Sequence, residues 1–158
     1  MPTQPIAEPP VTEFAGQLFF RLWRASHTRA ADALATLGLT PALFGLLNVL
    51  GTRDGAIQQE LGAVMGIDPS TMVSLIDQLE EAGLAKRRPC PRDRRAREVT
   101  ITPKGRRVLE RGRAMILEVE DEVLGGLDDA DRSQLLALLR QALESSPPQP
   151  AWTAAEGD

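Results

Sequence analysis

Apolar residues recur at helical spacing along most of this chain, and glycine, proline and capping residues separate the runs. The leucines that follow Thr40-Pro41 are spaced i, i+3, i+4, i+7, as on one helix face. These are Leu43, Leu46, Leu47 and Leu50. Threonine as N-cap and proline as first helical residue are typical of a helix start. The same analysis predicts six helices, over about residues 12–37, 40–52, 57–65, 68–82, 103–124 and 128–145.

The first predicted helix is apolar on two sides. One side carries Phe14, Leu18, Leu22 and Ala25, and the other carries Phe19, Trp23 and Ala30. Two apolar faces need more burial than one small domain offers. This helix is either the centre of a single core or packs against a second subunit, and we favour the second interpretation.

The third and fourth predicted helices are short and are joined by the turn Gly66-Ile67-Asp68. Two short helices joined by a turn of this length form a helix-turn-helix. The third helix is expected to bury Ile57, Leu61 and either Val64 or Met65; the fourth is expected to bury Met72, Leu75, Ile76 and Leu79. Gly83 suits the left-handed residue that ends the fourth helix.

A β-hairpin is predicted after the helix-turn-helix. Residues 98–102 alternate as a strand with Val99 and Ile101 inward, and Pro89 and Pro91 are expected to keep the preceding loop out of regular pairing. The last helix is expected to bury Leu135, Leu138, Leu139 and Leu143. The predicted fold class is mainly α with a small β-hairpin wing.

Positive charge is concentrated around this hairpin. Residues 86–113 hold twelve Lys or Arg and three Asp or Glu, a net +9, which leaves −13 for the rest because the whole chain is −4. Such a split attracts a polyanion at one place only. Double-stranded DNA is therefore the expected partner, although the sequence pI is about 5.1.

Candidate DNA-contacting residues fall into two groups. The outward face of the fourth helix offers hydroxyl, amide and methyl groups to base edges, from Ser70, Thr71, Val73, Ser74 and Gln78. The wing offers cations to a narrow minor groove, with a carboxylate placed to orient one of them: Arg92, Asp93, Arg94, Arg95 and Arg97. The fourth helix has no Lys or Arg and carries Asp77, Glu80 and Glu81, so the attraction must come from the wing.

Other chemistry finds little support. Cys90 and His27 are the single cysteine and histidine, so a disulfide framework and a zinc site within one chain are not expected. Basic neighbours favour reactivity of the Cys90 thiol, but an exposed and inert thiol is the expected state. No phosphate-binding glycine loop or metal-ligand spacing is present, so we expect neither an enzyme nor a cofactor.

The chain ends and the compartment are predicted from composition. Residues 1–10 are expected to be a disordered lead-in, and residues 146–158 a disordered tail. No signal-peptide pattern or membrane-length apolar run occurs, so a cytoplasmic protein without membrane attachment is expected.

The order of elements resembles the multiple antibiotic resistance regulator (MarR) family of winged-helix transcription factors. The resemblance rests on Leu39-Thr40-Pro41, on residues 70–73 and 77–84, on Asp93-Arg94-Arg95-Ala96 and on residues 99–105, and it covers about residues 12–145. It implies a homodimer interlocked through residues 12–37 and 103–145, with residues 39–102 as the DNA-binding domain. It also implies a pseudo-palindromic operator, Asp93 and Arg95 as the wing-tip pair, and Ser70 and Thr71 in the recognition helix.

The resemblance has departures and a further implication. Val73-Ser74 and Gln78 stand where many relatives carry Thr-Arg and Arg, which predicts differently directed specificity. Many members bind small aromatic compounds between the dimer helices and the DNA-binding domain, so Trp23, His27 and Phe44 could line a ligand pocket. The alternative, which we prefer, is that these three residues are dimer core.

The sequence thus predicts a dimeric DNA-binding transcriptional regulator, most simply a repressor relieved by a small aromatic ligand. A thiol-based regulator acting through Cys90 and a protein-interaction module independent of DNA remain as alternatives.

Overall fold

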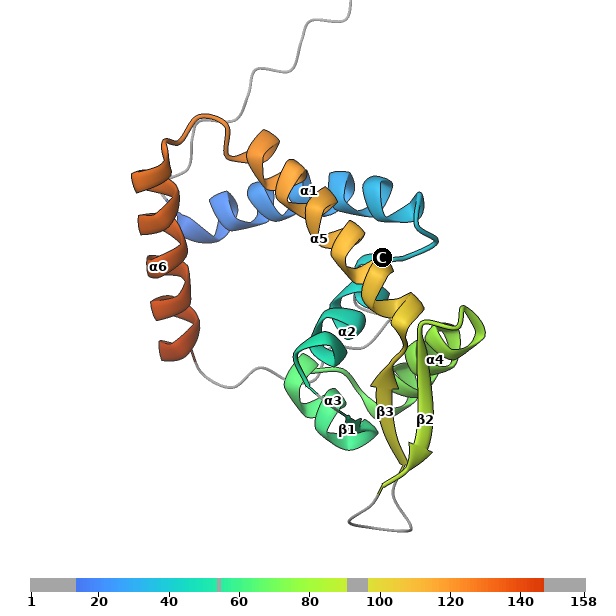
Figure 1. Cartoon of the computed structure of the whole chain (residues 1–158). Helices are drawn as coiled ribbons and strands as arrows, with labels where there is room; N and C mark the ends of the chain where they lie inside the picture. Colours follow the sequence, from blue (N-terminus) through green and yellow to red (C-terminus); the bar gives the residue numbers. More distant parts are fainter. Residues whose placement is uncertain (1–13, 54, 91–96, 147–158) are drawn as a thin grey trace, which may run out of the picture.

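The computed structural model describes residues 14–53, 55–90 and 97–146, which form six helices and one small antiparallel sheet. The helices are α1 (Ala15–Ala35), α2 (Pro41–Thr52), α3 (Gln58–Met65), α4 (Pro69–Glu81), α5 (Pro103–Val123) and α6 (Asp129–Ser145). The strands are β1 (Ala56–Ile57), β2 (Ala85–Pro89) and β3 (Arg97–Ile101), in the order β1-β3-β2. The predicted fold class is confirmed, including the β-hairpin formed by β2 and β3 (Figure 1).

We call α2, α3, α4 and the sheet the winged part, and α1, α5 and α6 the helical part. The winged part has a continuous core made by α2, α3, α4 and β3. Its fully buried side chains include Leu46, Leu47, Leu50, Leu61, Met72, Ile76, Leu79 and Val99. All four apolar residues predicted for α4 are buried. From α3, Met65 packs against this core and Val64 is exposed. Each buried leucine contributes about 1.5–3 kcal/mol relative to exposure.

The predicted helix ends are confirmed by their hydrogen bonds. Thr40 caps α2 by accepting a hydrogen bond from the Leu43 N–H at 3.2 Å. Gly83 has a φ of 70°, and the next residue, Leu84, donates its N–H to the Leu79 carbonyl at 2.8 Å. This is the Schellman arrangement, in which glycine takes the left-handed position without a Cβ clash. Local sequence therefore determines where α2 begins and where α4 ends.

The sheet has one strand more than predicted. Ala56 and Ile57 pair with Val99 and Glu98 as β1. Ile57 therefore precedes α3 instead of belonging to it, and it is half-buried while Ala56 is buried. A strand of two residues is too short to show an alternating pattern, which is why the sequence did not predict it.

The prediction that Pro89 lies outside regular pairing is wrong. Pro89 is the last residue of β2 and pairs with Arg97 of β3. Because β2 is an edge strand, it tolerates a residue that lacks an N–H donor. Pro91 lies outside the described residues.

A tight joint connects the sheet to α5. The Thr102 hydroxyl accepts a hydrogen bond from the Gly105 N–H at 2.9 Å and donates one to the Gly83 carbonyl at 2.8 Å. A Cβ on Gly105 would lie 2.1 Å from the Leu84 carbonyl oxygen. The T-P-x-G sequence therefore reflects a place where α5 crosses the end of α4 too closely for any side chain.

The burial predicted for α6 is wrong within one chain. None of its described residues is buried; Leu135 and Leu139 are half-buried, and Leu138 and Leu143 are 55% and 74% exposed. Figure 1 shows the reason, because α6 stands apart from the winged part at one side of the molecule, beside the start of α1 and the loop that follows α5. Its apolar spacing is therefore not explained by the folding of a single chain. The proposed tail, residues 146–158, lies outside the described residues apart from Ser146, as does the lead-in.

Candidate nucleic-acid interface

The outward face of α4 carries the residues predicted to contact bases. Ser70, Val73, Ser74 and Gln78 are exposed, and Thr71 is half-buried. The Gln78 amide Nε2 donates to the Ser74 carbonyl at 3.2 Å and to the Ser74 hydroxyl at 3.3 Å. The five predicted side chains are therefore uncharged, and Ser74 and Gln78 are ordered by hydrogen bonds to each other, which suits hydrogen-bond readout of a groove.

The N-terminus of α4 is capped by Asp68. Its Oδ1 accepts hydrogen bonds from the Ser70 hydroxyl at 2.5 Å, the Ser70 N–H at 2.9 Å and the Thr71 N–H at 3.1 Å. Hydrogen bonds from the side chains of Ser70 and Thr71, and then from the backbone of Thr71, hold the pKa of Asp68 well below its usual value. While this cap persists, Ser70 presents its oxygen as an acceptor and not its proton as a donor.

Arg87 joins β2 to α4 and does not extend into solvent. Its Nη1 donates to Asp77 Oδ1 at 2.6 Å and also to Glu80 Oε2, and its backbone N–H donates to Glu80 Oε1 at 2.6 Å. Burial disfavours the charged guanidinium, but the hydrogen bonds and charges of Asp77 and Glu80 outweigh it and raise the pKa of Arg87. Two of the acidic residues that made α4 look unsuited to DNA are thus ion-pair partners of the wing.

Three further cations of the basic stretch also bind within the protein. Arg88 pairs with Glu98, which lies directly opposite it on β3 and whose side chain is nearly buried. Lys104 Nζ donates to the Ala82 carbonyl at the end of α4, at 2.7 Å. Arg113 binds Asn48 of α2 through Nε and Nη2 at 3.0 and 2.8 Å. These contacts do not change the net charge counted for residues 86–113, but they reduce the number of cations that are free to reach DNA.

The remaining cations of the basic stretch divide between solvent and the undescribed wing tip. Exposed side chains with no ion pair inside the described ranges are Lys86, Arg97, Arg106, Arg107 and Arg111. The predicted wing-tip residues Arg92, Asp93, Arg94 and Arg95 lie outside the described residues. Their contact with DNA stays a prediction.

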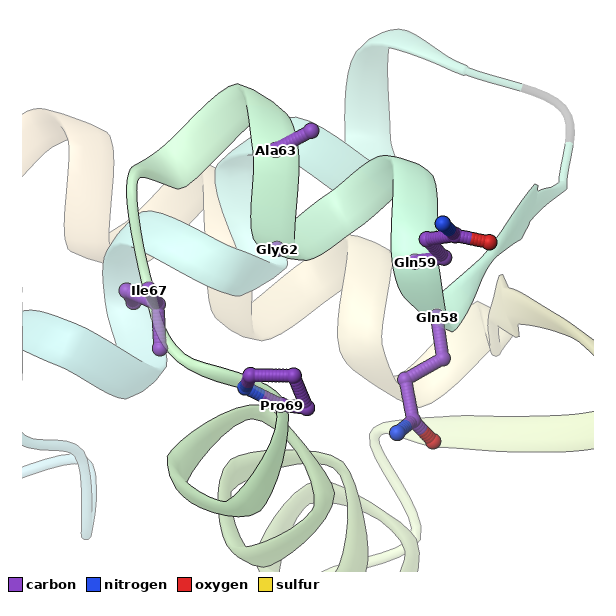
Figure 2. Close-up of a pocket in the computed structure, with 6 residues that line it drawn as sticks. All are labelled: Gln58, Gln59, Gly62, Ala63, Ile67 and Pro69. Atoms are coloured by element: carbon purple, nitrogen blue, oxygen red, sulfur yellow. The ribbon is translucent and has the colours of Figure 1, made fainter. Parts of the chain in front are cut away.

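Sequence analysis missed two residues at the start of α3. Gln58 and Gln59 line a pocket of about 350 Å³ between α3 and α4, together with Gly62, Ala63, Ile67 and Pro69. Figure 2 shows the Gln58 side chain extending from α3 on the side of the pocket where α4 begins. Amide side chains at the start of the first helix of a helix-turn-helix are the signal that could have identified them, since that helix crosses the DNA backbone.

The three predicted ligand residues lie in two places. Trp23 and His27 stack on each other along α1, with ring centroids 4.8 Å apart and an interplanar angle of 24°. Phe44 packs into the core of the winged part, where a Cβ on Gly112 of α5 would lie 2.7 Å from its ring. Across residues 14–53, 55–90 and 97–146, Phe44 forms no ring contact with the other two. A shared ligand pocket therefore stays a prediction.

The described residues give no support to a reactive thiol, a metal site or a membrane-spanning helix. Cys90 is 7% exposed, so the expectation of an exposed thiol is wrong, and burial keeps oxidants from it. No cluster of three or more His, Cys, Asp or Glu suited to a metal occurs among the residues described. No helix in that part of the chain is long and apolar enough to cross a membrane.

Comparisons with known proteins agree with this architecture. The sequence model of the MarR family matches residues 37–96. A curated Thauera aromatica protein, named as a transcriptional regulatory protein for the hcr operon, is 34% identical over 141 residues, covering 87% of this chain and 85% of that protein.

Two solved structures are similar over most of their length. One is CouR from Rhodococcus jostii RHA1 bound to p-coumaroyl-CoA, with 28% identity, a TM-score of 0.75, and coverage of 87% of this chain and 96% of CouR. The other is Bordetella bronchiseptica BpsR, from work on regulation of its DNA binding by 6-hydroxynicotinic acid, with 26% identity, a TM-score of 0.76, and coverage of 87% and 97%.

Proposed function

The chain belongs to the MarR family of transcriptional regulators, and on that premise we propose that it is a dimeric, sequence-specific DNA-binding repressor released by a small aromatic ligand. The observation that carries the proposal is the set of exposed, uncharged side chains on α4, namely Ser70, Val73, Ser74 and Gln78, beside a cationic wing. In this arrangement the wing supplies attraction to phosphates and α4 supplies discrimination between bases.

The first step is DNA binding by two winged parts. Each α4 lies in a major groove with Ser74 and Gln78 toward the base edges, while Val73 offers methyl groups to thymine. Arg95 enters the neighbouring minor groove, and Gln58 at the start of α3 approaches the DNA backbone. The half-sites lie about one helical turn apart.

The dimer is supported by the apolar surface of the helical part. α1 exposes Phe14, Phe19, Phe20 and Trp23, and α6 exposes Leu138 and Leu143. An open apolar pocket of about 360 Å³ also lies between these helices and α5, lined in part by Leu22, Leu117 and Leu135. Large apolar side chains exposed in this number support an interface here. A second copy of the same helices would cover it.

The second step is release. The BpsR and CouR structures were solved in studies of 6-hydroxynicotinic acid and of p-coumaroyl-CoA respectively, and both compounds contain an aromatic ring. Trp23 and His27 of this chain offer stacking surfaces to such a ring. A ligand that binds the non-DNA-bound spacing of the two winged parts more tightly would shift the population away from the operator.

One titration tests both steps. A duplex selected from genomic DNA is bound by the unaltered protein and by Arg95→Ala, and fluorescence anisotropy is followed across salt concentrations. Removing a phosphate-region cation is expected to weaken binding several-fold and to reduce the slope of log K against log salt by about one. Adding 6-hydroxynicotinate or p-coumarate is expected to release the duplex.

Arg140→Ala is the matched control, since it removes one positive charge from exposed α6 and should leave affinity unchanged. Equal affinities for Arg95→Ala and Arg140→Ala would remove Arg95 from the interface. Failure of every aromatic acid tested to release DNA would leave a regulator controlled by another signal.

A further inference from the structure

Asp77 lies where a negative charge is unfavourable for a DNA-binding helix. It follows Val73 by four residues and Ser74 by three, so it shares their side of α4. Glu80 follows Asp77 by three residues and continues the same side. Like charges within a Debye length of about 10 Å repel, so these carboxylates would oppose the approach of phosphates.

Arg87 is the cation that meets both carboxylates. It bonds to Asp77 and Glu80 through Nη1 and to Glu80 through its backbone N–H, and its side chain is only 25% exposed. The bridge turns a pair of negative charges into a group with a net charge of −1. The two carboxylates occupy the N–H groups of Nη1, and the side chain is mostly covered, which limits the access of a phosphate to the guanidinium.

The same bonds fix the wing to the helix. β2 is the edge strand of the sheet, and Arg88 binds Glu98 inside the sheet without reaching α4. Within the described residues, Arg87 is the one side chain of β2 that forms an ion pair with α4. The angle between the wing and α4 decides whether both can enter adjacent grooves of one duplex.

We propose that Arg87 is a positioning residue for DNA recognition, which contacts no DNA itself but orients the wing against α4 and offsets part of the negative charge of Asp77 and Glu80. This inference rests on the proposed DNA-binding function. It predicts that the specificity ratio, the affinity for the selected site divided by that for random duplex, depends on the bridge and not on the charge of Arg87.

The decisive variant keeps Arg87 and removes its partners. Asp77→Asn combined with Glu80→Gln removes two negative charges near the DNA, so charge alone predicts tighter binding to every duplex. Loss of positioning predicts a specificity ratio lowered about tenfold while affinity for random duplex rises. Both affinities are measured by anisotropy on full-length protein over a range of salt concentrations.

Arg87→Met gives the complementary test. The specificity ratio is expected to fall by a similar factor, and the slope of log K against log salt is expected to stay unchanged because no phosphate contact is lost. Arg106→Met, which removes an exposed cation of α5, is the charge-matched control and should leave the ratio unchanged. Arg87→Lys keeps the positive charge but loses the planar guanidinium that bonds to two carboxylates, so it should restore the specificity ratio only in part.

The outcomes separate this inference from the proposed function. A slope reduced by about one in Arg87→Met, with an unchanged ratio in both variants, would identify Arg87 as a phosphate ligand and overturn the positioning role. A merely structural role would lower both affinities together in step with the folded fraction seen by circular dichroism, again leaving the ratio unchanged. If the unaltered protein binds no duplex in a salt-dependent way, the proposed function fails and this inference fails with it.

Discussion

The winged part and the helical part both carry apolar residues at helical spacing, but they bury these residues differently. α4 buries Met72, Leu75, Ile76 and Leu79 within its own chain, whereas α6 buries none of its described residues. The helical spacing of apolar residues predicts that one face of a helix will be buried, but it does not predict whether the same chain or a second chain buries it. The winged part therefore buries its apolar faces within one chain, with Leu34 of α1 and Leu109 of α5 completing its core. The helical part is half of an interface under the proposed dimer.

The largest expected effect comes from opening the core of the winged part. Leu79→Ala removes a fully buried side chain and should lower the free energy of unfolding by about 2–5 kcal/mol, through lost transfer energy and the cavity left behind. Urea unfolding measures it, and the loss should be the same at low and high protein concentration. Val64→Ala, on the exposed side of α3, is the control and should stay within about 0.5 kcal/mol.

The second test breaks the helical part. Leu138→Glu with Leu143→Glu places charges on exposed apolar positions of α6, and under the proposed dimer it should weaken association by about 2 kcal/mol or more. Analytical ultracentrifugation measures the dissociation constant. Gln141→Glu adds a charge at an exposed polar position of the same helix and should change little. An unaltered dissociation constant in the double variant would take α6 out of the interface.

The smallest expected effects are at the helix caps. Thr40→Ala removes the oxygen that accepts from the Leu43 N–H and should cost about 1 kcal/mol at any protein concentration. Asp128 caps α6 by accepting from the Asp131 N–H at 2.9 Å. Because α6 lacks a core of its own, Asp128→Ala should act mainly on dimer association. If Asp128→Ala instead lowers the free energy of unfolding as Thr40→Ala does, and leaves the dimer dissociation constant unchanged, then α6 is stabilised within its own chain and the proposed difference between the two parts is wrong.

Local features of the fold were predictable because their causes are local. Thr40, Asp68 and Thr102 cap the helices that follow them, as predicted, and Gly83 takes its left-handed conformation. Each depends on atoms within a few residues. β1 was not predictable, because Ala56 and Ile57 become a strand only through Val99 and Glu98, some forty residues later.

The residues of the candidate interface could be predicted from the sequence, but the ion pairs formed among them could not. The exposed residues of α4 were expected, and so was a cationic wing. That Arg87 and Arg88 would bind carboxylates instead of solvent was not expected, because Asp77 and Glu80 meet Arg87 only after the chain reverses at Gly83. A count of charges therefore overstated the number of cations that are free to reach DNA.

The amino-acid order by itself determined the helix boundaries, the apolar faces and the location of the basic stretch, since spacing, capping and charge are properties of neighbouring residues. Tertiary structure alone decided which cations are neutralised, that Gly105 must lack a side chain beside Leu84, and that α6 leaves its leucines exposed. These depend on distances between segments remote in the chain, and such distances exist only once the helices and the sheet have packed.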